Sequence, residues 1–240
     1  MIQALYTAAS GMASNQTRLD VLANNLANVG TTGFKQDLVA IDTTQLANAV
    51  QGEGEYALTM STVHAGRSGI DMTPGSIRST GNLMDLAIEG PGLIVVSTPD
   101  GERYTRGGSF VRDANGYLTT DAGFQVMGQS GPIRVPETGL VIDGTGRLAD
   151  GQALRFVSDA EPSRLVKAGG NLYAPADETT PPDAVNDVAI AQGQIENSNV
   201  NVVRTMVEML CTLRSYEAYQ RTIQALDQTN GQASTDLGRV

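Results

Sequence analysis

Two regions, one at each end of the chain, carry apolar residues at alternating steps of three and four. In the first region the pattern starts at Ile2, and only Gln16 interrupts it. Its positions are Ile2, Leu5, Ala9, Met12, Gln16, Leu19, Ala23 and Leu26. This spacing predicts a helix with the apolar stripe of a coiled coil. We expect the helix to end at Val29, because the next residue, Gly30, favours helix termination.

The second region repeats this pattern near the end of the sequence. Its positions are Val202, Met206, Met209, Leu213, Tyr216, Gln220 and Ile223. The run Asn197-Ser198-Asn199 precedes them and supplies residues that cap helix N-termini. We therefore expect a second helix over about residues 201–228, with a tail over 229–240 that either frays or continues as a poorer helix.

Turn residues recur at short intervals between the two helices. Pro99-Asp100-Gly101, Asn115-Gly116 and Asp143-Gly144 are examples. The segments between such turns are short and rich in β-branched and aromatic residues, as in Leu93–Thr98, Tyr117–Thr120 and Phe124–Met127. We expect an antiparallel β domain, in which aspartates such as Asp100, Asp113, Asp121, Asp143 and Asp150 cap the backbone amides of their own turns.

Together these patterns predict an α+β fold. Long N- and C-terminal helices pack as a coiled coil, and a central antiparallel β-rich domain lies between them in the sequence. The expected parts are an N-terminal helix region (1–35), an extended connector (36–80), the β-rich domain (81–190) and a C-terminal helix with its tail (191–240). Within the connector, residues 36–70 are polar and only weakly periodic, which favours an extended or partly disordered segment.

The terminal helices are weak as isolated elements. Gly11 costs on the order of 1 kcal/mol in a helix interior, and Asn24, Asn25 and Asn28 are poor helix formers. Such helices become stable when they pack against others. An intramolecular pair of the first and last helices is one solution. Because apolar residues such as Leu22 and Leu210 lie beside the two stripes, packing between subunits is the second expectation.

Composition narrows the range of functions. The chain has 16 basic and 26 acidic residues, a formal charge of −10, and its basic residues do not cluster, so we expect no nucleic-acid partner. Its longest aliphatic run, residues 93–96, is far too short to span a membrane. The first basic residue is Arg18, so the start does not read as a secretory signal.

Residues that could carry chemistry are scarce. His64 is the only histidine and lies in the polar connector, so we expect a structural or solvent-exposed role for it. Cys211 is the only cysteine, and we expect it to be a small buried or interfacial side chain. The sequence therefore predicts no catalytic site, no metal site and no cofactor, and we expect the protein not to be an enzyme.

Three segments resemble a known family. Residues 23–35 (ANNLANVGTTGFK) are similar to an N-terminal motif of flagellar rod and hook proteins, and residues 194–203 (QIENSNVNVV), followed by Arg214-Ser215-Tyr216-Glu217, resemble the matching C-terminal motif. Segments 81–88, 104–110 and 115–118 are similar to the β domain that these proteins share. The resemblance is to the flagellar basal-body rod protein family and covers nearly the whole chain.

The resemblance implies a structural subunit of the bacterial flagellar basal body, in the periplasmic rod. It implies helical assembly in which the terminal helices line the inner tube and the β domain faces outward, forming part of the torque-transmitting drive shaft. Expected partners are proximal and distal rod proteins, the flagellar type III export apparatus, which would take the chain uncleaved, and surrounding ring proteins. The chain looks more like the proximal than the distal rod protein in segments 71–75 and 130–136 and in its compact length. The alternatives are a distal rod protein or a non-enzymatic β-domain binding module.

The same reading gives an expected set of subunit-packing residues. They are Leu5, Met12, Leu19, Asn24, Asn25, Leu26, Asn28, Phe34, Asn199, Val202, Met206, Met209, Leu213, Tyr216 and Ile223. Most lie on the two apolar stripes. The asparagines of the first helix are included because an amide both donates and accepts hydrogen bonds, and could fix the register between neighbouring subunits. The alternative is that they are the polar, fraying end of a helix.

Overall fold

A computed structural model describes most of the chain. The described residues are 2–47, 59–137, 139–158, 161–177, 179–185 and 188–237, and within these the side chains of 2–4, 41–47, 59–68 and 233–237 are not described. The chain forms two compact units. The first comprises Met1–Ala27, Asp37–Gly69 and Asn201–Val240, and the second comprises Asn28–Gln36 and Ile70–Val200. Helices dominate the first unit and strands the second, so the predicted α+β class is confirmed.

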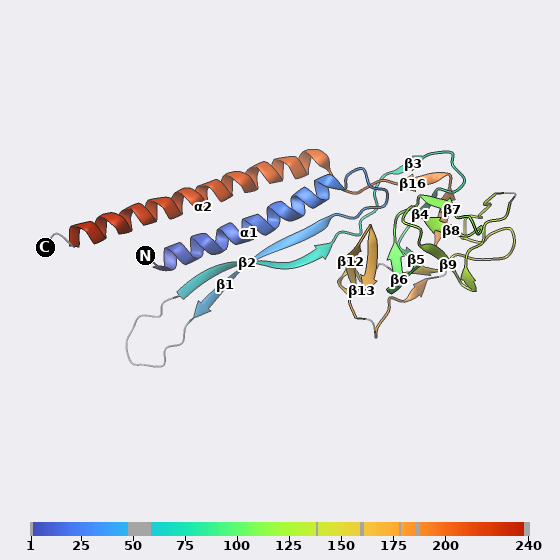
Figure 1. The fold of residues 1–240 in the computed structure, drawn as a ribbon, viewed down its shortest axis with the longest axis horizontal. Coiled ribbons are helices and arrows are strands. Elements are labelled where there is room, and N and C mark those ends of the chain that lie inside the picture. The colour runs from blue at the N-terminus through green and yellow to red at the C-terminus, as the bar shows by residue number, and fades with distance from the viewer. Residues whose placement is uncertain are drawn as a thin grey trace. The chain divides into compact units, whose positions relative to one another are not determined.

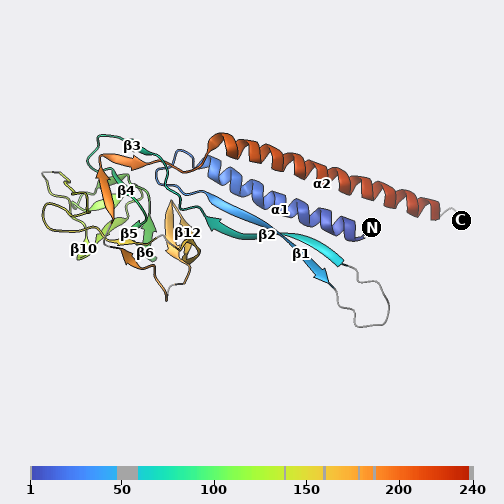
Figure 2. The ribbon, with the colours of Figure 1, turned by 180° about the vertical axis from the view of Figure 1, so that it is seen from behind.

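Two helices form most of the first unit. Helix α1 (Ile2–Ala27) and helix α2 (Val202–Leu237) lie side by side and run in opposite directions (Figures 1 and 2). Both predicted helices are therefore present. Helix α2 passes through Gly231, so the tail continues as a helix as far as Leu237, which is one of the two expected outcomes.

Strands occupy much of the segment that we expected to be an extended or partly disordered connector. Strand β1 (Asp37–Ala47) and strand β2 (Thr59–Ile70) form a two-stranded sheet, and β1 packs beside α1 in both views of the ribbon (Figures 1 and 2). The segment is extended, but its pairing was missed because its β-branched residues alternate too weakly with polar ones to identify a strand. Residues 48–58 and the side chain of His64 lie outside the described part.

The second unit is built from short strands. They are β3 (Ile77–Ser79), β4 (Leu86–Glu89), β5 (Leu93–Thr98), β6 (Gly101–Thr105), β7 (Phe110–Arg112), β8 (Leu118–Thr120), β9 (Gln125–Gly128), β10 (Gly131–Pro132), β11 (Phe156–Val157), β12 (Leu165–Gly169), β13 (Leu172–Pro175), β14 (Ala184–Val185), β15 (Ala189–Gln192) and β16 (Gln194–Glu196). A 3-10 helix, η1 (Pro162–Arg164), precedes β12. The main path of the largest sheet is β12-β13-β6-β5-β9-β8-β7, and the pairs β4–β15 and β3–β16 form two smaller sheets. These pairings are antiparallel, as predicted.

Strand β5 divides the core of this unit. Its four apolar residues, 93–96, are all buried. Ile94 and Val96 belong to one apolar cluster, which includes Phe110, whereas Leu93 and Val95 belong to another, which includes Tyr173. Successive side chains of a strand point to opposite faces, so one continuous apolar run serves two clusters.

The aspartates of the turns bind local amides. Oδ1 of Asp113 accepts hydrogen bonds from the backbone amides of Asn115 (2.9 Å) and Tyr117 (2.7 Å). Asp143 and Asp150 accept similar bonds within their own turns. The predicted capping role is confirmed for these three residues.

Candidate functional site: a buried ion cluster and an exposed helix face

Three charged side chains meet inside the second unit. Glu196, at the end of β16, accepts a hydrogen bond from Nζ of Lys35 at Oε1 and one from Nε of Arg106 at Oε2, each at 2.6 Å. Their side chains are 0%, 1% and 2% exposed for Lys35, Arg106 and Glu196 respectively. We call Lys35, Arg106 and Glu196 the ion cluster. Its two cations and one anion have almost no access to water.

Backbone groups complete the hydrogen bonding of the ion cluster. The amide of Gly75 donates to Oε1 of Glu196 at 2.7 Å. Lys35 also donates to the carbonyl of Thr73 at 2.8 Å, and Nη2 of Arg106 donates to the carbonyl of Gly90 at 2.7 Å. A buried charge is tolerated when its hydrogen bonds are made, so these carbonyls help to hold the second cation that Glu196 cannot neutralise.

The ion cluster changes the acidity of its carboxyl group. Burial acts to raise the pKa of Glu196, but the hydrogen bonds from Lys35, Gly75 and Arg106 favour the ionised form more strongly, and the pKa is lowered below its ordinary value of 4.5. Glu196 is therefore a carboxylate at neutral pH.

Gly33 brings the N-terminal motif against the ion cluster. Its φ is +66°, a left-handed conformation that favours glycine, and a Cβ at this position would lie 2.2 Å from the carbonyl oxygen of Arg106. Its amide donates to the carbonyl of Glu196 at 2.7 Å. A side chain at this position would prevent the approach that lets Lys35 reach Glu196.

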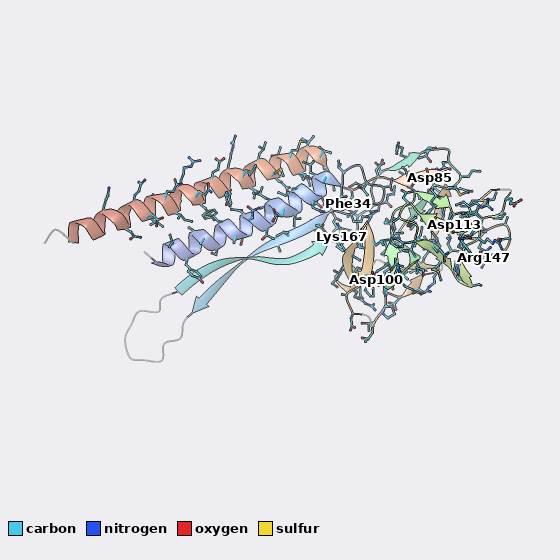
Figure 3. All side chains as sticks on the ribbon, viewed as in Figure 1. Phe34, Asp85, Asp100, Asp113, Arg147 and Lys167 are labelled. Carbon is cyan, nitrogen blue, oxygen red and sulfur yellow. The ribbon has the colours of Figure 1, made fainter. Side chains whose placement is uncertain are left out.

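Neighbouring residues of both motifs are held in the same unit. Nζ of Lys167 lies 3.9 Å from the centre of the Phe34 ring and donates to the carbonyl of Lys35 at 2.6 Å (Figure 3). Asn199 accepts a hydrogen bond from the amide of Gln36 at 2.8 Å and donates to the carbonyl of Asp71 at 2.8 Å. Phe34 and Asn199, both predicted as subunit-packing residues, thus have partners within this chain.

The ion cluster is suited to a structural role. Its carboxylate oxygens are occupied by three donors, and its charged groups are buried, so a substrate has no access to them. Within the described residues, no group of three or more His, Cys, Asp or Glu side chains is arranged to hold a metal ion. None of the helices in the described part is long and apolar enough to cross a membrane.

In the first unit, the most buried helix positions are displaced from the predicted stripes. Among them are Ala8, Gly11, Leu22, Asn25, Thr205 and Thr212, each one residue before a predicted position. Several of these residues are small, and a Cβ on Gly11 would lie 2.8 Å from Cζ of Tyr219. The two helices approach closely along small residues, so larger apolar side chains of the predicted stripes are left partly or wholly exposed.

The outer side of α2 is apolar. Five of its large apolar residues are exposed: Val203 (73%), Met206 (48%), Val207 (54%), Leu210 (59%) and Leu213 (41%). We call these five residues the exposed apolar face. They follow one another at helical spacing over three turns, which is typical of a surface that packs against another element. Cys211 is also exposed and is not buried within the chain.

The predicted subunit-packing residues differ widely in exposure. Leu5, Asn24, Met206 and Leu213 are exposed; Met12, Leu19, Leu26, Asn28, Asn199, Val202, Met209, Tyr216 and Ile223 are half-buried; Asn25 and Phe34 are buried. The side chain of Ile2, which starts the first stripe, lies outside the described part. The exposed and half-buried helix residues remain predicted subunit contacts.

Asn25 uses its amide within the chain. Its Oδ1 accepts a hydrogen bond from the amide of Asp37 at 2.8 Å, and its Nδ2 donates to the carbonyl of the same residue at 2.9 Å. This pair of bonds anchors the start of β1 to the end of α1. The hypothesis that Asn25 sets the register between subunits therefore competes with a role inside the subunit.

The ion cluster was not predicted from the sequence. Lys35, Arg106 and Glu196 each lie within or beside a motif segment, but no spacing rule relates residues 161 positions apart. The only available signal was that three motifs, otherwise uncharged, contain two basic residues and one acidic residue.

Three family models match the chain in order. "Flagella basal body rod protein" matches residues 5–35, "Flagellar hook protein FlgE/F/G D1 domain" matches residues 87–197, and "Flagellar basal body rod FlgEFG protein C-terminal" matches residues 191–236. The first and third matches contain most of α1 and most of α2, and the second contains the strands from β5 to β16.

Curated relatives match over nearly their whole length. The chain is 34% identical to the flagellar basal-body rod protein FlgF of Escherichia coli, covering 98% of both chains, and 32% identical to FlgF of Caulobacter vibrioides, covering 100% of both. It is 30% identical to the flagellar basal-body rod protein FlgG of Bacillus subtilis, covering 95% of this chain and 96% of that protein.

The matched helices and β domain define a structural component of the bacterial flagellum. The chain belongs to the flagellar basal-body rod protein family, close to FlgF, and is a structural subunit of the basal-body rod. The resemblance seen in the sequence is confirmed.

Proposed function

We propose that this chain is a subunit of the proximal rod, which assembles helically through α1 and α2 and forms part of the torque-transmitting drive shaft. In this proposal the helices pack as coiled coils with helices of neighbouring subunits, lining the inner tube, while the β domain faces outward. The subunit transmits force by rigid packing and performs no catalysis.

The exposed apolar face of α2 carries the proposal. Val203, Val207 and Leu210 are more than half exposed in the single chain. Burying a large apolar side chain stabilises an assembly by roughly 1.5 to 3 kcal/mol, so the face as a whole offers a substantial driving force for association. Helix-to-helix packing is the association that its helical spacing suits.

The choice of the proximal type rests on the relatives and the sequence. FlgF relatives reach 34% identity over 98% of the chain and FlgG relatives reach 32% over 98%, so the identities support FlgF by only a small margin. Segments 71–75 and 130–136 and the short length support the same choice.

The remaining partners in this proposal follow from assembly of the rod. Other proximal and distal rod proteins are the neighbours of the subunit, the flagellar type III export apparatus delivers it, and ring proteins surround it. Ring proteins, in this proposal, contact the outer β domain and not the helices.

A substitution on the exposed apolar face tests the proposal. Leu210→Glu adds a charge at a side chain that is 59% exposed, so the isolated subunit should unfold at the same temperature as the wild type. In cells that lack the native protein, the variant should be absent from purified basal bodies and the cells should not swim. Gln224→Glu, an exposed position on α2, makes the same charge change and serves as the control.

Normal incorporation of Leu210→Glu would contradict assembly through this face. Together with strong amide protection of both helices in the dilute subunit, that result would favour the alternative, a self-contained β-domain binding module.

A further inference from the structure

Two arginines converge over the turn that joins β7 to β8. Gly116 lies in this turn with φ of +86°. The position that a Cβ of Gly116 would occupy lies 3.3 Å from Nη2 of Arg112 and 3.8 Å from Nε of Arg134. Glycine suits this position because of its left-handed conformation. Both guanidinium groups lie close to one point over the turn, so a carboxylate held just outside that point could contact both cations.

The two arginines have no anionic partner within the described part of the chain. Both residues are exposed, and neither guanidinium group forms an ion pair or a hydrogen bond there. Asp113, which follows Arg112 and is labelled in Figure 3, directs Oδ1 to the amides of Asn115 and Tyr117. Two positive charges that lie close to the same point repel one another, and an anion between them would remove that repulsion.

We propose that Arg112 and Arg134 form an anion-binding pair, which we call the arginine pair, and that it takes an aspartate or glutamate side chain of an adjacent protein subunit. The inference rests on the proposed function, because it names a contact made by the β domain within the rod. A planar guanidinium binds a carboxylate through two parallel hydrogen bonds. Two guanidinium groups together restrict the direction from which a carboxylate can approach.

The charge of the chain favours a protein carboxylate as the ligand. The chain carries 26 acidic and 16 basic residues, so a second copy, or a similarly acidic relative, would present carboxylates readily. The same net negative charge repels a long polyanion, and two arginines are far fewer than a polyanion site requires. A short electrostatic contact between subunits suits an isolated basic pair on an acidic protein.

A peptide titration tests the arginine pair directly. The full chain is titrated with a hexaglutamate peptide at low salt, and binding is followed from the amide resonances of residues 112–118. The wild type should bind weakly, and Arg112→Gln/Arg134→Gln should bind at least about threefold more weakly. The control, Arg78→Gln/Arg214→Gln, removes two other exposed arginines and the same total charge, and should retain wild-type binding. Equal affinity of wild type and Arg112→Gln/Arg134→Gln would overturn the inference.

Two further results separate this inference from the proposed function. If the wild type is missing from purified basal bodies while peptide binding still requires both arginines, the rod proposal fails and the arginine pair stands as a carboxylate site. The wild type is also titrated with purified peptidoglycan at the same carboxylate concentration. If peptidoglycan binds more tightly than the peptide, and if this difference disappears in Arg112→Gln/Arg134→Gln, the inference that the ligand is a protein carboxylate is wrong.

Discussion

Lys35 and Glu196 lie 161 positions apart in the sequence, and Nζ of Lys35 is 2.6 Å from Oε1 of Glu196 inside the second unit. Lys35 ends the N-terminal motif, and Glu196 lies in the C-terminal motif. Arg106, in the β domain, binds the other carboxylate oxygen. The three segments that resemble rod proteins therefore meet in one buried contact inside the second unit.

Removing the charge of Glu196 should be strongly destabilising. Glu196→Gln leaves Lys35 and Arg106 buried without an anion, and breaking a buried ion pair in this way costs about 3 to 5 kcal/mol. Urea unfolding of the full chain, followed by the fluorescence of its tyrosines, measures the loss. The control is Glu102→Gln, because Glu102 pairs with Arg155 at 2.7 Å but is 44% exposed. Its loss should be below about 1 kcal/mol, and similar losses for both variants would show that burial is not decisive.

Acid should weaken the fold partly through Glu196. Its pKa is lower in the folded chain than its ordinary value of 4.5, so the unfolded chain binds the proton more readily. The stabilisation is fully present above about pH 4.5 and is lost as the pH falls through the folded-state pKa. Unfolding free energy measured from pH 7 to pH 3 should fall more steeply in the wild type than in Glu196→Gln. Parallel curves would contradict this assignment.

Asn25→Leu should loosen the contact between α1 and β1. The substitution removes both hydrogen bonds that the Asn25 side chain makes to the backbone of the half-buried Asp37, at a cost of about 1 to 3 kcal/mol. Hydrogen exchange at Asp37 should quicken, whereas Asn24→Leu, at an exposed position, should change it little. Unchanged exchange and stability in Asn25→Leu, together with failed rod assembly, would instead support the role of Asn25 in register between subunits.

Gly11→Leu should separate the helix pair. Even a Cβ at this position would lie 2.8 Å from the Tyr219 ring, and overpacking of this kind typically costs about 1 to 3 kcal/mol. Hydrogen exchange of the α1 amides should quicken, and Tyr219→Ala in the same chain should restore part of the protection. Ala9→Leu adds the same side chain at an exposed position and should have little effect.

The sequence predicted the elements of the fold better than their faces. Both helices, strand β5 and the antiparallel β domain follow from periodicity and turn residues. The buried helix positions do not follow from periodicity. The predicted stripes rest on the assumption that the large apolar residues face the partner helix. Here Gly11 and Thr212 allow close approach, and Met206 remains exposed one residue beyond Thr205. Amphipathic pattern alone cannot distinguish a surface used within the chain from one used between chains.

The candidate site was predictable only in part. Met206 and Leu213, two residues of the exposed apolar face, were among the predicted packing residues, whereas the ion cluster was absent from the prediction. Charged residues are usually exposed, so sequence alone assigns Lys35 to the surface. Its burial depends on the tertiary approach at Gly33, which no local pattern encodes.

A cryo-EM reconstruction of the intact basal body, with this chain traced, would show whether the subunits assemble through the exposed apolar face. We expect Val207 and Leu210 to be buried against helices of neighbouring subunits in the proximal rod. A map in which both side chains face solvent, or in which the chain lies outside the rod, would contradict this expectation.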